Sequence, residues 1–234
     1  MQRSVLLTII MACAFVAQAQ FVTVKPYVAT LPVDSAVCVA GNDTITAPTG
    51  GVSGFDSASV NGKYVWGVGI PYGATAHYLS GTKITLSAAP TIGSAGRVIW
   101  FDMFHNTSYG TGEWMGQIFR VYSYPGVGSP RTLVSVVLKD QEDILGNTDL
   151  VLLKAWSDTL GIDSATVVMP AAQALKVIGS ISLSTATDYG GGRTLEAKNI
   201  QLECPGDVLY ARLIAKATMV PTTTTPFLLE FGFK

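Results

Sequence analysis

Acidic side chains beside an aromatic residue are the feature of this sequence that comes closest to a catalytic site. Glu113 precedes Trp114 in a glycine-rich stretch, Asp102 lies in an apolar run, and further acidic residues lie at 140–143. Glycoside hydrolysis needs two facing carboxyl groups, one of them with a raised pKa, and a nearby tryptophan could bind a sugar ring. A chain with 16 acidic residues supplies such neighbours by chance. We therefore predict no catalytic residues from them.

Metal and cofactor sites also lack a sequence signal. Asp140, Glu142 and Asp143 could supply oxygen ligands to calcium, but the run lacks the loop pattern of a calcium motif, and a solvated turn accounts for it better. The two histidines, His77 and His105, have no metal-ligand spacing. The chain has no nucleophile elbow, P-loop or dinucleotide fingerprint. The sequence predicts no catalytic, cofactor-binding or metal-binding residues, and a protein that is not an enzyme.

Two groups of aromatic residues could form a ligand platform. One contains Tyr64, Trp66, Tyr72 and Tyr78, and the other lies within 100–104. Aromatic side chains bury large areas wherever sheets pack, so a sandwich core or a subunit interface accounts for them better.

Short apolar strands separated by glycine and proline turns make up most of the chain. The clearest is the last, where Phe227, Leu229, Phe231 and Phe233 alternate with smaller or polar residues and fall on one face. Strands are predicted at 21–24, 35–40, 63–70, 82–87, 96–104, 117–123, 132–138, 149–156, 177–183, 197–202, 208–218 and 227–233.

This pattern predicts an all-β protein, a β-sandwich of jelly-roll type with about a dozen short strands and at most one short helix. The helix is expected at 170–176, which begins with proline. Residues 41–61 and 105–116, rich in glycine and polar residues, are expected to be loops. Without a long or biased linker, residues 21–234 are expected to form a single domain.

Charge is sparse along the whole chain. Only 13% of the 234 residues are charged and the formal net charge is −1, with no basic block. We therefore expect no nucleic-acid partner. Low charge suits a surface that is covered by copies of the same chain or by partners, and it also suits a weakly charged secreted protein.

The N-terminal residues 1–20 resemble a secretory signal peptide. Arg3 is followed by an apolar run at 5–16 and by a small-residue cleavage site after Ala19. The run is short for a membrane span, so we expect no membrane association after processing. The alternative is an apolar N-terminal arm that is retained and buried in an assembly.

The number of cysteines in the mature protein depends on whether residues 1–20 are cleaved. Cys13 would leave with a cleaved signal peptide, and Cys38 and Cys204 would remain as an even pair. A disulfide between them is permitted outside the cytosol. Two buried thiols that never meet are the alternative, and the sequence leaves both open.

The C-terminal hairpin resembles the ending of small jelly-roll structural proteins of tailed bacteriophages. The residues that carry the resemblance are the strand at 209–215, which begins Leu-Tyr, the Thr-Pro loop at 221–226 and the Phe-x-x-x-x-Gly ending at 227–233. The strand at 117–123 and the stretch at 163–183 are similar to that family more loosely. Together these segments cover roughly the second half of the chain, and their short apolar motifs have modest specificity.

The resemblance implies a non-enzymatic virion component of the capsid-decoration, head-fibre or tail-associated type that forms homo-oligomers and contacts other virion proteins. The alternative is a secreted bacterial β-sandwich at the cell surface, such as an adhesin, a carbohydrate-binding module or an extracellular filament subunit. Its partners would be cell-surface proteins or a glycan. A secreted glycan-active enzyme is a third hypothesis, which has only the scattered carboxylates behind it.

Overall fold

A computed structural model describes residues 20–28, 30–47, 57–67, 69–104, 108–122, 131–144, 146–155 and 166–234. Within them the chain forms three antiparallel sheets and two four-residue helices, α1 (Ser57–Val60) and α2 (Ala171–Ala174). The all-β sandwich expected from the sequence is confirmed for this part of the chain.

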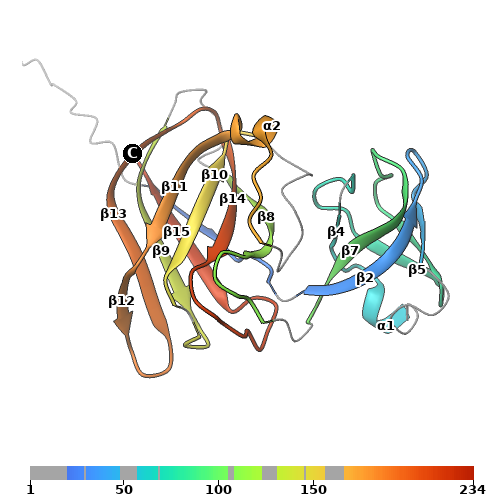
Figure 1. Ribbon diagram of the computed structural model, residues 1–234, viewed down its shortest axis with the longest axis horizontal. Coiled ribbons are helices and arrows are strands. Elements are labelled where there is room, and N and C mark those ends of the chain that lie inside the picture. Colours follow the sequence, from blue (N-terminus) through green and yellow to red (C-terminus); the bar gives the residue numbers. More distant parts are fainter. Residues whose placement is uncertain are drawn as a thin grey trace, which may run out of the picture.

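Two sheets form a sandwich (Figure 1). Its strands are β1 (Gln20–Val24), β8 (Trp114–Tyr122), β9 (Arg131–Asp140), β10 (Thr148–Leu153), β11 (Val177–Leu183), β12 (Thr185–Asp188), β13 (Arg193–Cys204), β14 (Val208–Ala215) and β15 (Phe227–Phe233). One sheet has the order β1-β15-β9-β13-β12 and the other β11-β10-β14-β8. The pairing is nested along the chain, because β1 pairs with β15, β8 with β14, β9 with β13 and β10 with β11.

The third sheet is built from the chain between β1 and β8 and lies beside the sandwich (Figure 1). Its strands are β2 (Thr30–Cys38), β3 (Thr44–Thr46), β4 (Val65–Gly67), β5 (Ala76–Ser80), β6 (Lys83–Leu86) and β7 (Ser94–Phe104). Their order is β4-β7-β2-β3-β6-β5. A separate group of buried side chains, including Ile45, Ile84 and Phe101, forms its core. The prediction of one domain over 21–234 stays a prediction, since two cores can belong to one cooperative unit.

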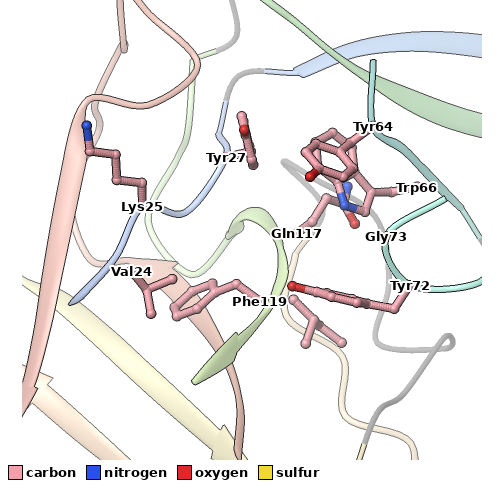
Figure 2. Close-up of a pocket in the computed structure, with 10 residues that line it drawn as sticks. Val24, Lys25, Tyr27, Tyr64, Trp66, Tyr72, Gly73, Gln117 and Phe119 are labelled. Atoms are coloured by element: carbon pink, nitrogen blue, oxygen red, sulfur yellow. The ribbon is translucent and has the colours of Figure 1, made fainter. Parts of the chain in front are cut away.

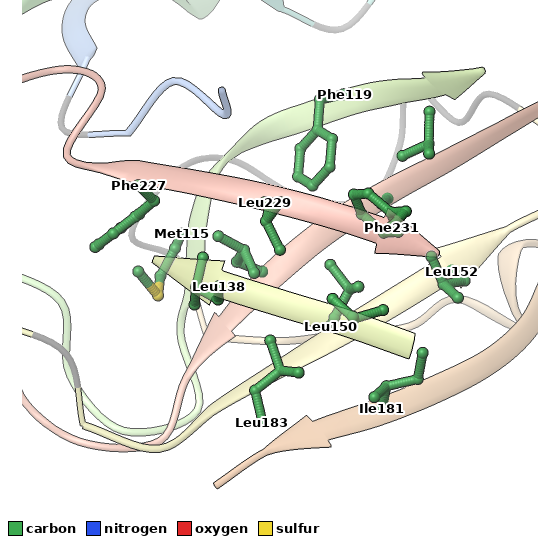
Figure 3. Close-up of a cluster of buried hydrophobic side chains, with 14 of the residues drawn as sticks. Met115, Phe119, Leu138, Leu150, Leu152, Ile181, Leu183, Phe227, Leu229 and Phe231 are labelled. Carbon is green, nitrogen blue, oxygen red and sulfur yellow. The ribbon is translucent and has the colours of Figure 1, made fainter. Parts of the chain in front are cut away.

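The last strand, β15, lies in the middle of the sandwich core. It pairs with β1 on one side and with β9 on the other, and Phe231 lies opposite Val136. Phe227, Leu229, Phe231 and Phe233 are all fully buried, as the period-two pattern predicts. They belong to one cluster of buried side chains with Leu150 and Leu152 of the opposite sheet, and Figure 3 shows Phe227, Leu229 and Phe231 within this cluster.

Several predictions of secondary structure hold, and two predicted loops are wrong in part. β11 and β15 have the predicted bounds, α2 lies in the predicted helix, and Ile84 and Leu86 of β6 are buried. The expected loop at 41–61 is wrong in part, because it contains β3 and α1. The expected loop at 105–116 ends early, because β8 begins at Trp114. Among the described helices, none is long and apolar enough to cross a membrane.

Phe231→Ala should lower the free energy of unfolding by about 3–5 kcal/mol, because it removes a large buried side chain and leaves a cavity. Phe21→Ala is the matched control: Phe21 lies on the neighbouring strand β1 and is 69% exposed. Chemical unfolding followed by fluorescence measures both. Equal losses in the two variants would contradict the placement of β15.

Candidate functional site

A cavity of about 340 Å³ lies where the sandwich meets the six-stranded sheet. Ten residues line it, from three parts of the chain: Val24 at the end of β1 with Lys25 and Tyr27 after it, Tyr64, Trp66, Tyr72 and Gly73 around β4, and Gln117, Ile118 and Phe119 of β8. In Figure 2 the side chains of Tyr27, Tyr64, Tyr72 and Phe119 lie around a common space, whereas the side chain of Lys25 points away from it. Cavities of roughly 300–1,000 Å³ with apolar walls and a few polar groups are typical of small-molecule sites.

Three aromatic rings form one wall of this aromatic cavity. The ring centroid of Tyr27 lies 6.0 Å from that of Tyr64 and 5.5 Å from that of Trp66, with interplanar angles of 54° and 49°. These spacings are ordinary for tilted aromatic pairs. Tyr64 is 41% exposed, whereas Trp66 is buried. The wall is therefore packed into the protein at Trp66 and open to solvent at Tyr64.

Tyr72 connects the wall to the sandwich. Its hydroxyl accepts a hydrogen bond of 3.2 Å from the backbone N–H of Arg120, and the Arg120 guanidinium lies 4.2 Å from the centre of its ring. Burial raises the pKa of Tyr72, and the contacts with Arg120 offset part of that rise. The hydroxyl therefore keeps its proton at neutral pH.

Asp102 of β7 lies behind Tyr27 and accepts hydrogen bonds from the side chains of Tyr27 and Thr224. Burial raises the pKa of Asp102, while the positive charge of Lys63 and the two hydrogen bonds act in the opposite direction. Burial, and then the negative charge of Asp102, raises the pKa of Tyr27. This carboxyl group is not among the residues that line the cavity.

A β-bulge in β8 places Gln117 on the cavity wall. Residues 116–118 of β8 stand opposite the single residue Arg212 of β14, and Gly116 has a positive φ of 64°. Arg212 is buried, and its Nε donates a hydrogen bond of 2.9 Å to the carbonyl oxygen of Gly116. The side-chain Nε2 of Gln117 is buried without a hydrogen-bond partner. Bulges often redirect a side chain next to a functional site.

The carboxylates that suggested glycoside hydrolysis serve other contacts. Glu113 accepts a hydrogen bond of 2.7 Å from the backbone N–H of Gly110, which closes a turn. Trp114 is buried, and the guanidinium of Arg212 lies 4.7 Å from its ring. Neither Glu113 nor Trp114 lines the aromatic cavity.

The acidic residues at 140–143 hold loops together. Asp140 is buried and accepts hydrogen bonds from the backbone N–H groups of Glu142, at 2.9 Å, and of Ile144, at 2.6 Å. Glu142 accepts hydrogen bonds from Thr222 and Thr223, and Asp143 forms an ion pair with Arg193 at 3.1 Å. In the part of the chain that the structure describes, no group of three or more His, Cys, Asp or Glu side chains could hold a metal ion.

The remaining candidates lie apart from the cavity. His77 is exposed on β5, and His105 and Cys13 lie outside the described residues. Cys38 and Cys204 are buried in different cores and are not joined by a disulfide. Of the predicted aromatic group, Tyr64, Trp66 and Tyr72 line the cavity, whereas Tyr78 packs against the core of the six-stranded sheet.

Sequence reasoning missed Tyr27 and Gln117. Tyr27 follows Pro26 outside any alternating pattern, and Gln117 reads as an ordinary strand residue.

Comparison of the chain with family models, with curated proteins and with solved structures gives no match.

Gly116→Ala should lower the free energy of unfolding by about 3 kcal/mol, because a side chain there is strained at positive φ and clashes with its neighbours. An added Cβ would lie 1.9 Å from the carbonyl oxygen of Tyr27. The control is Gly81→Ala, where an added Cβ meets nothing within 4 Å. Thermal unfolding compares the two variants, and a Gly116→Ala protein as stable as the control would contradict this geometry.

Proposed function

We propose that the chain is a non-enzymatic structural protein of a bacteriophage virion that self-assembles through a jelly-roll sandwich. The observation that carries this proposal is the strand order. Without β12, the described part of the sandwich has eight strands. If these are numbered 1 to 8 in chain order, one sheet has the order 1-8-3-6 and the other 2-7-4-5. This is the arrangement expected when one long antiparallel ribbon rolls up into two facing sheets.

The remaining strands are additions to that plan. β12 extends the edge beside β13, and the six-stranded sheet is inserted between the first and second strands of the eight. An insertion at one end of a sandwich leaves the nested pairs intact, because loops carry added segments more readily than strands do. The jelly-roll assignment therefore agrees with the family that the C-terminal hairpin resembles.

Exposed apolar side chains support assembly. Phe21 lies on β1, at the end of its sheet, and Val168 and Leu175 flank α2 with most of their surface exposed. Together with a charged fraction of only 13%, they suit a surface that copies of the chain or other virion proteins cover. The structural contacts of Glu113, Asp140 and Glu142 support a non-enzymatic role.

The alternative is a secreted bacterial β-sandwich of the cell surface, such as an adhesin, a carbohydrate-binding module or a filament subunit. The observation that favours it is the resemblance of residues 1–20 to a secretory signal peptide. Cleavage after Ala19 would leave every strand of the sandwich that the structure describes intact. The aromatic cavity would suit a binding module of this kind.

We expect the purified protein to form oligomers in solution, measured by light scattering after gel filtration. Phe21→Asp should shift the population towards monomer, because a charge on an apolar contact must be desolvated. Leu79→Asp is the control, since Leu79 is exposed on β5, which belongs to the six-stranded sheet. A wild-type chain that stays monomeric at high concentration would refute self-assembly.

The N-terminus separates the two functions. Mass spectrometry of the protein from its native source should give a start at Met1 or Gln2 if it is a virion component assembled in the cytoplasm. A start at Gln20 would favour the secreted alternative and count against the virion proposal.

A further inference from the structure

We propose that the aromatic cavity binds a sugar ring of a glycan. This binding goes beyond the structural role proposed above and does not depend on it. Two observations carry it: the tilted aromatic wall and an unpartnered donor on the cavity lining.

The aromatic wall suits the apolar face of a sugar. The C–H groups on a sugar ring carry small positive partial charges, and the face of an aromatic ring is electronegative, so the two attract as they exclude water. Tyr27 is tilted by about 50° against both Tyr64 and Trp66. A puckered ring can contact two such surfaces at once, whereas a flat aromatic ligand stacks on only one.

Polar groups on the lining suit the hydroxyl groups of the same ligand. The buried Nε2 of Gln117 has no partner, and a buried donor left unsatisfied costs roughly 1–3 kcal/mol. A sugar hydroxyl could accept its hydrogen bond. The hydrogen bond from Tyr27 to Asp102 fixes that ring before a ligand arrives, which reduces the entropy lost on binding.

The charges and the size argue against other occupants. A quaternary ammonium ligand also favours aromatic walls, but here the guanidinium of Arg120 already lies 4.2 Å from the centre of the Tyr72 ring and would repel it. A proline-rich peptide needs an extended groove, whereas this cavity is a compact space of about 340 Å³ lined by three chain segments. A neutral or acidic sugar meets neither objection.

The experiment titrates the full-length protein with a panel of sugars by calorimetry and by ligand-observed NMR. The panel contains glucose, galactose, mannose, N-acetylglucosamine, glucuronic acid and their short oligomers. We expect at least one to bind, and to raise the unfolding temperature, because a ligand that binds only the folded state stabilises it. Choline and a proline-rich peptide are titrated in parallel.

Two variants place the binding. Tyr64→Ala should weaken it about tenfold by removing one aromatic surface, and its partial exposure limits the cost to folding. Gln117→Glu keeps the shape of the side chain but replaces the Nε2 donor, and should weaken binding of the same sugar. Tyr189→Ala is the matched control, because Tyr189 is 73% exposed in the turn between β12 and β13.

Loss in Tyr64→Ala and Gln117→Glu with unchanged binding in Tyr189→Ala supports the proposal. If Tyr64→Ala fails to fold, Gln117→Glu decides alone. Absence of binding across the panel, equal binding in Gln117→Glu and wild type, or binding only of choline or the peptide would overturn it. None of these results bears on the mass of the oligomer, so the virion proposal stands or fails separately.

Discussion

The pairing of β15 between β1 and β9 is the constraint on which the sandwich depends. It joins the first described strand to the last, so it closes the outermost of four nested pairs and brings together segments that lie far apart in the sequence. Phe227, Leu229, Phe231 and Phe233 supply the apolar face that makes this closure favourable. Contacts of such long sequence separation form late and at high entropic cost, which a strongly apolar strand can offset.

The same sandwich sets the position of the cavity through the bulge in β8. Gly116 lets the backbone of Tyr27 approach to a distance that no side chain would allow, and Arg212 fixes the carbonyl oxygen of Gly116 from the opposite strand. Arg212 also lies against the buried ring of Trp114. A buried arginine with these contacts stabilises one local backbone path. The direction of Gln117 thus follows from the core of the sandwich.

Much of the fold could be predicted from alternation alone, and the cavity only in part. β15 and β11 carry clear apolar patterns, whereas β3 and β12 are short and polar and depend on their partners for pairing. Tyr64, Trp66 and Tyr72 are close in sequence and could be recognised as a group. Tyr27 and Gln117 could not, because an insertion of six strands separates them and only tertiary packing brings them together. No local pattern records a contact of that kind.

The position of the cavity couples ligand binding to the contact between the two cores. Tyr72 belongs to the inserted segment and Arg120 to the sandwich, and they meet through a ring contact and a backbone hydrogen bond. A ligand that contacts Tyr64 and Trp66 on one side and Gln117 on the other would bind only when the six-stranded sheet and the sandwich are docked. By linkage, the free energy by which docking strengthens ligand binding equals the free energy by which the bound ligand stabilises docking. In an assembly, such a ligand would hold the inserted sheet at a fixed angle to the sandwich.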